Sequence, residues 1–157
     1  MTEVERMLGQ LDRAFTGEAW HGPALLELLD DISFEQASRH PIRDAHSIWE
    51  IVNHIASWNS IVQHRLAGQK VDVTPEVDWP PVWESSDVAW TRSLEHIRDC
   101  RARLRKAIAA INEADLETTP PGQKDSRYVM VHGIIQHDLY HAGQIAILKK
   151  ALRGRTV

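Results

Sequence analysis

Apolar residues recur every three or four positions along four long stretches of this sequence, and this spacing limits the fold more than any other feature. The first stretch shows it with Val4, Met7, Leu11 and Phe15. A period near 3.6 places such residues on one face of an α-helix, whereas a half-buried strand needs strict alternation, which the chain lacks. Four long amphipathic helices without strands predict an all-α fold, a four-helix bundle.

Capping residues and breakers indicate where these helices begin and end. Thr2 with Glu5, and Ser47 with Glu50, have the capping-box spacing that satisfies free backbone N–H groups at a helix start. A glycine follows the first, second and fourth stretch, where each helix should stop. The expected helices cover residues 2–16, 47–67, from 85 or 86 to about 111, and 127–153, with a further helical pattern at 24–32.

Residues 33–46 and 68–84 are predicted to be irregular connectors. Three prolines exclude a long helix in the second connector. A loop of this length in a compact domain usually has a function. We therefore expect Trp79 or Trp83 to cover part of a pocket or a dimer surface.

The composition fits one domain over residues 1–157. The net charge of −4 gives no attraction for phosphate backbones, so no nucleic-acid partner is expected. No run of roughly 18 apolar residues is present, which argues against a membrane partner. The single cysteine, Cys100, cannot form an intramolecular disulfide and favours a reducing, cytoplasmic location. Cys100 is interpreted as a small core residue; its neighbour Arg101 also falls on the apolar stripe, which the pattern does not explain.

Three of the nine histidines lie where the helical pattern requires apolar residues. The buried series of the last helix runs from Ile134 through His137 (or Asp138) and His141 to Ile145, and His54 (or Ile55) lies on the apolar face of the second helix. Side chains four apart on a helix lie over one another, so two imidazoles there can converge on one ion. A lone interior histidine is more often a hydrogen-bonded core residue, but three are hard to satisfy without a shared cation. The pattern predicts one divalent metal bound by all three, and the other six histidines are assigned no role.

The segments HSIWEIVNHIASW (residues 46–58) and HDLYHAGQIAILKK (residues 137–150) resemble the DinB family, the DinB/YfiT-like metalloenzymes. The likeness extends over nearly the whole chain. It implies a four-helix bundle in which His54, His137 and His141 bind a divalent metal, zinc or nickel. It also implies kinship with S-transferases and isomerases in which the metal activates a low-molecular-weight thiol, such as mycothiol or bacillithiol.

Three polar residues are candidates for supporting the metal. Gln144 lies one turn after the last histidine and could orient a ligand or substrate, or simply pack between helices. Glu50 lies one turn before the histidine of the second helix, but its capping role already explains it. Asp138 follows a histidine as glutamate does in H-E-x-x-H proteases, yet no third protease-type ligand lies downstream, and a helix-surface position competes as its explanation. Gly143 is expected to allow close helix approach.

Three protein ligands leave at least one open position, as in catalytic zinc sites. The leading hypothesis is a metal-dependent enzyme, a thiol-dependent S-transferase or a hydrolase that acts on a small electrophilic molecule. The alternative is a non-catalytic, stress-related bundle that binds a metal or another ligand. DNA binding is disfavoured by the acidic charge. A homodimer is one assembly that the chain could form.

Overall fold

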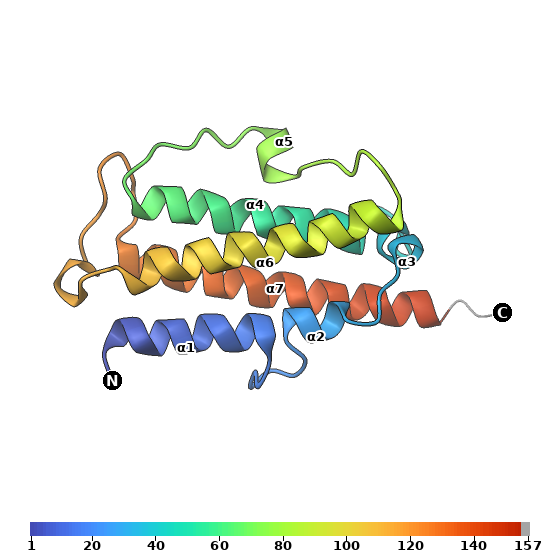
Figure 1. Ribbon diagram of the computed structural model, residues 1–157, viewed down its shortest axis with the longest axis horizontal. Coiled ribbons are helices and arrows are strands. Elements are labelled where there is room, and N and C mark those ends of the chain that lie inside the picture. Colours follow the sequence, from blue (N-terminus) through green and yellow to red (C-terminus); the bar gives the residue numbers. More distant parts are fainter. Residues whose placement is uncertain (155–157) are drawn as a thin grey trace.

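The computed structural model describes residues 1–154 and contains helices without strands in that range. The four long helices lie side by side along the long axis of the molecule (Figure 1). They are α1 (Glu3–Thr16), α4 (Ile48–Leu66), α6 (Asp87–Ala109) and α7 (Arg127–Arg153). The predicted all-α four-helix bundle is therefore confirmed. Within residues 1–154 no helix is long and apolar enough to cross a bilayer.

The chain connects α4 to α6 by a long crossover. The two helices run in the same direction, and residues 67–86 return along the length of the bundle between them (Figure 1). Antiparallel neighbours can be joined by a short turn, whereas parallel neighbours need a connection as long as the helices themselves. The crossover therefore passes over α4, and this position brings it to the functional site.

The capping signals mark the helix ends correctly. Thr2 and Ser47 each accept a hydrogen bond from the backbone N–H of the glutamate three residues later, which completes the predicted capping boxes. Ser86 caps α6, one of the two positions expected, and Ser126 caps α7. The predicted ends of α1, α4, α6 and α7 are confirmed to within about two residues, the usual uncertainty of helix boundaries.

Short helices occupy the segments between the long ones. The helical pattern at 24–32 contains only α2 (Leu25–Leu29). The prediction that 33–46 and 68–84 are irregular was wrong in part, because they contain α3 (Phe34–Ser38) and α5 (Pro75–Asp78). Each is about one turn long, begins at a serine or threonine cap and carries too few residues for a periodic apolar pattern. A 3₁₀ turn, η1 (Glu113–Asp115), precedes α7.

The charged residue on the apolar stripe of α6 is explained by an ion pair. Arg101 and Asp138 of α7 are 4% and 0% exposed, and the Arg101 guanidinium donates to Asp138 Oδ2. The same guanidinium carbon lies 4.6 Å from the ring centroid of Phe15 in α1. The interpretation of Asp138 as a helix-surface residue was therefore wrong, since its carboxylate is held in the core by a partner 37 positions away.

Removing one member of this pair should destabilise the fold strongly. Arg101→Met leaves the Asp138 carboxylate buried and unpaired, so the free energy of unfolding should fall by about 3–5 kcal/mol. The double variant Arg101→Met with Asp138→Leu should recover most of that loss, because neither charge is then buried alone. Urea unfolding of both variants measures this. A loss below about 1 kcal/mol in Arg101→Met would contradict the assignment.

Candidate metal centre

Two helices bring the three predicted histidines together. His54 comes from α4, and His137 and His141 come from α7, one turn apart. Each offers one nitrogen within 4.8 Å of the others. His54 and His141 are both 5% exposed, and His137 is half-buried. The ring centroids lie 4.4–4.9 Å apart, so the imidazoles form one compact cluster inside the bundle.

Hydrogen bonds fix which nitrogen each ring turns inward. Nδ1 of His54 lies 2.6 Å from the backbone oxygen of Asp78, and Nδ1 of His141 lies 2.6 Å from Oε1 of Gln144. Carbonyl oxygens only accept, so both Nδ1 atoms must carry the proton and donate it. The Nε2 atoms of His54 and His141 therefore keep free lone pairs. Such outer hydrogen bonds are the usual means of fixing the tautomer of a metal-binding histidine.

The third ring makes a shared cation the best solution. Nε2 of His137 lies 2.9 Å from Nε2 of His54, whose lone pair it faces. If His137 donates there, its buried Nδ1 must accept, and within residues 1–154 that atom has no hydrogen-bond partner. A divalent ion shared by the three rings would take a lone pair from each ring and replace the contact between the Nε2 atoms of His137 and His54, which leaves Nδ1 of His137 as the one nitrogen of these rings without a partner in residues 1–154. Imidazole ligands suit zinc and nickel, so the residues present fit such an ion.

A profile of the DinB superfamily matches residues 19–145, most of the chain. The chain belongs to the DinB superfamily. This confirms the resemblance found in the two histidine segments. A crystal structure of a conserved protein from Enterococcus faecalis is similar over 99% of both chains, with a TM-score of 0.69 and 17% identity, which supports the fold alone. No curated protein matches the chain.

The crossover covers the cluster in this DinB-superfamily protein. The Trp79 ring stacks on His54 with centroids 3.8 Å apart, and its other face stacks on His46 at 3.6 Å. The prediction for this loop is thus confirmed for Trp79, while Trp83 is 90% exposed. Trp58 donates from Nε1 to Oδ1 of Asp78 at 2.7 Å and holds the end of α5 in place.

Two contributors were missed in the sequence. Asp78 acts through its backbone oxygen, which no side-chain pattern can indicate; the Thr74–Pro75 start of α5 was the only local signal for the turn that positions it. His46 had been assigned no role because it precedes the helix cap, yet its ring is stacked on Trp79.

The three candidate supporting residues have different surroundings. Gln144 bonds His141 directly. Glu50 caps α4, and its Oε2 lies 3.0 Å from His40 and 3.5 Å from His46 rather than at the cluster. Partial burial alone would raise the pKa of Glu50, but hydrogen bonds from the Ser47 backbone and His40 outweigh it and lower the pKa.

Asp138 makes no hydrogen bond to the cluster, and Gly143 does not lie at a close helix contact. Oδ1 of Asp138 lies 3.9 Å from Nδ1 of His137, which is beyond hydrogen-bond range, and its firm partner is Arg101. The prediction that Gly143 allows close helix approach was wrong. It is exposed, and a Cβ there would meet no heavy atom within 4 Å outside the neighbouring turns of its helix.

Two cavities adjoin the cluster and its supporting residues. One, of about 260 Å³, is lined by His137, Trp58 and Gly133 among others. The other, of about 320 Å³, is lined by Gln144 and His46. A side chain at Gly133 would project into open space, so glycine there leaves the first cavity wide. Small molecules therefore have room beside His137.

Burial keeps His54 and His141 uncharged near neutral pH, because it lowers the pKa of both. Desolvation, reinforced by the nearby His137, lowers the pKa of His141 to about 4. Desolvation also lowers the pKa of His54, although the hydrogen bond to the Asp78 backbone opposes it. Neutral imidazoles keep the lone pairs that a metal requires, so the interior prepares both rings for binding. By contrast, burial raises the pKa of the Cys100 thiol, which agrees with a core role.

The lowered pKa of His141 should make the metal-free protein sensitive to acid. Between pH 6.5 and about 4 an unfolded His141 binds a proton and the folded one does not. The free energy of unfolding should therefore fall as the pH drops through this window, by about 3 kcal/mol from this residue. Urea unfolding of chelator-treated protein at several pH values measures the slope. His141→Leu should flatten it, and an unchanged slope in that variant would contradict the assignment.

Proposed function

We propose that this protein is a metal-dependent enzyme in which His54, His137 and His141 hold one divalent ion, zinc or nickel. A thiol or water is activated there and reacts with a small electrophilic substrate, by S-transfer or by hydrolysis. The observation that carries the proposal is the convergence of three imidazoles beside a cavity that His137 itself lines. A site that only stabilised the fold would not need this adjoining space.

The donor set favours activation of an incoming group. A bound divalent ion would supply Lewis acidity, which lowers the pKa of water or of a thiol. Within residues 1–154 the group that could hold the ion consists of three imidazoles and no carboxylate. No anionic ligand from the protein would therefore reduce the charge of the ion. A thiolate would be a good partner for that charge, and this favours thiol transfer over hydrolysis.

The surrounding residues orient the ligands and limit water. The Asp78 backbone and Gln144 hold His54 and His141 in the tautomer that leaves Nε2 free. Trp79 covers one face of His54, and Trp58 lies with its ring centroid 5.6 Å from that of His137. Removing water strengthens the electrostatic interaction between the cluster and a bound anion.

The stacked Trp79 also gives weight to the alternative, a non-catalytic bundle that binds a metal or another ligand. An indole at 3.8 Å from His54 closes that side of the cluster. The two functions differ in whether a small molecule can reach the ion, and thiol binding to the metal-loaded protein separates them.

The first test is metal content. The protein purified without a histidine tag should contain about one zinc or nickel ion per chain by elemental analysis, and His137→Ala should lose it. The matched control is His132→Ala, a half-buried histidine of the same helix outside the cluster. Metal loss should also lower the melting temperature, because ligand binding to the folded state adds to its stability. Full occupancy in His137→Ala would refute the shared site.

The second test is access to the ion. Low-molecular-weight thiols added to the cobalt-substituted protein should produce a thiolate-to-cobalt charge-transfer band. The same titration of His141→Ala is the control and should give a weak band or none. The enzyme proposal fails if the metal-loaded protein responds to no thiol and its crystal structure contains a fourth side-chain ligand. The non-catalytic function would then be the one that remains.

A further inference from the structure

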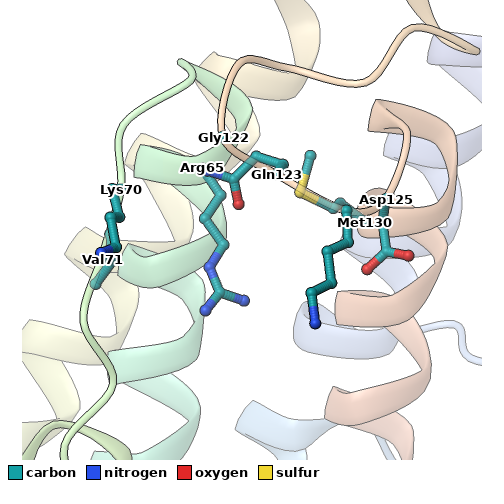
Figure 2. Close-up of a pocket in the computed structure, with 8 residues that line it drawn as sticks. Arg65, Lys70, Val71, Gly122, Gln123, Asp125 and Met130 are labelled. Atoms are coloured by element: carbon teal, nitrogen blue, oxygen red, sulfur yellow. The ribbon is translucent and has the colours of Figure 1, made fainter.

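A positively lined cavity lies at the end of α4, away from the histidine cluster. It has a volume of about 320 Å³ and is lined by Arg65, Lys70 and Lys124, with Asp125 as its one acidic residue. Figure 2 shows the Arg65 side chain extending from α4 into the space between Lys70 and Asp125. The whole chain carries a net charge of −4, so three cations around one cavity run against the overall balance.

In the part of the chain that the structure describes, the cations of this cavity have few carboxylate partners. Within residues 1–154 neither Arg65 nor Lys124 forms an ion pair with a carboxylate. Lys70 lies 3.5 Å from Asp72, but both side chains are 83% exposed, and such surface pairs contribute little. Arg65 is half-buried, and its guanidinium lies over the Trp58 ring, 5.6 Å from the centroid. A stacked arginine with free N–H groups is well suited to bind a carboxylate or a phosphate.

This cavity adjoins the smaller cavity that His137 lines. Arg65, Asp125 and Met130 also line the cavity of about 260 Å³ that contains His137. Trp58 bridges the two, since its ring lies 5.6 Å from the Arg65 guanidinium carbon and 5.6 Å from the His137 ring. The guanidinium is therefore within twice that distance of His137, a span that a small metabolite can cover.

The smaller cavity, whose lining includes both Arg65 and His137, is mostly apolar between these two residues. Its walls include Val62, Met130 and Ile134 beside the Trp58 ring. Gly133 adds no side chain and leaves room along α7. Such walls suit a hydrocarbon spacer, whereas the end at Arg65 and Lys124 suits a negatively charged group.

We propose that the molecule that reaches the metal is elongated and carries a terminal anionic group, a carboxylate or a phosphate, bound by Arg65 and Lys124. Its apolar spacer lies along Trp58 and Gly133, and its reactive end lies at His137. The assignment of the reactive end rests on the proposed function. The anion site rests on its own residues.

Three thiols that share one spacer and differ at the far end test the proposal: ω-mercaptohexanoate, ω-mercaptohexyl phosphate and ω-mercaptohexanol. Their dissociation constants for the zinc-loaded protein are measured by calorimetry. The alcohol should bind at least about tenfold more weakly than the better of the two anions, since a charge-assisted bond to arginine is lost. The ratio between the two anions identifies which group the site prefers.

Variants assign the preference to this cavity. Arg65→Gln should remove the difference between anion and alcohol. Arg92→Gln, which removes the same charge from an exposed position of α6 that lines none of these cavities, should preserve it. Melting temperatures of both variants check that they remain folded. Equal affinities for the three thiols in the wild-type protein, or an unchanged preference in Arg65→Gln, would overturn the proposal.

Hexanoate and hexyl phosphate, which have no thiol, separate this proposal from the function. If the protein takes up no metal but binds either anion in an Arg65-dependent manner, the anion site stands and the metal-dependent function fails. If the metal-loaded protein binds all three thiols equally, the function stands and the anion site fails.

Discussion

Three imidazoles lie within 4.8 Å of one another between α4 and α7, and the burial and hydrogen bonds of the site serve this arrangement. Rings this close must avoid both mutual charge repulsion and unpaired polar atoms. Burial lowers the pKa values of His54 and His141, and two carbonyl acceptors fix their tautomers. The cluster can then supply lone pairs to a cation without first losing protons, so metal binding near neutral pH should release few protons from these two rings.

The topology of the bundle brings the crossover to the histidine cluster, where it adds contacts that α4 and α7 do not provide. Because α4 and α6 run in the same direction, the connection between them must travel back along the bundle, and it does so over the cluster. This segment contributes Asp78 and Trp79 to His54. The buried pair of Arg101 and Asp138 joins α6 to α7 beside His137. The imidazoles are thus oriented by α4, α7 and the crossover, while the ion pair fixes α6 against α7.

Most of the fold was predictable because its signals are local. Caps such as Ser47 and the periodic apolar positions depend on residues within one or two turns, and they gave the long helices. The histidines were recognisable as polar residues on apolar faces. Asp138 and the backbone of Asp78 were not, since their roles depend on partners brought close only by the tertiary fold. Periodicity also cannot detect a one-turn helix such as α3 or α5. For this reason both connectors were predicted to be irregular although each contains a short helix.

The nearest acceptor of His54 is a main-chain oxygen, so the site depends on the path of the backbone as well as on its side chains. Substitutions at position 78 can remove the bond from Trp58 to the Asp78 side chain and the carboxylate oxygen that lies 3.3 Å from Nδ1 of His54, but they leave the carbonyl in the chain. What fixes that carbonyl is the path of the backbone through α5. Substitutions in the crossover that preserve this path and the Trp79 indole should therefore preserve the orientation of His54. A proteolytic cut between α4 and α5 would disturb the cluster more than most point mutations there, although the cut lies far from any ligand.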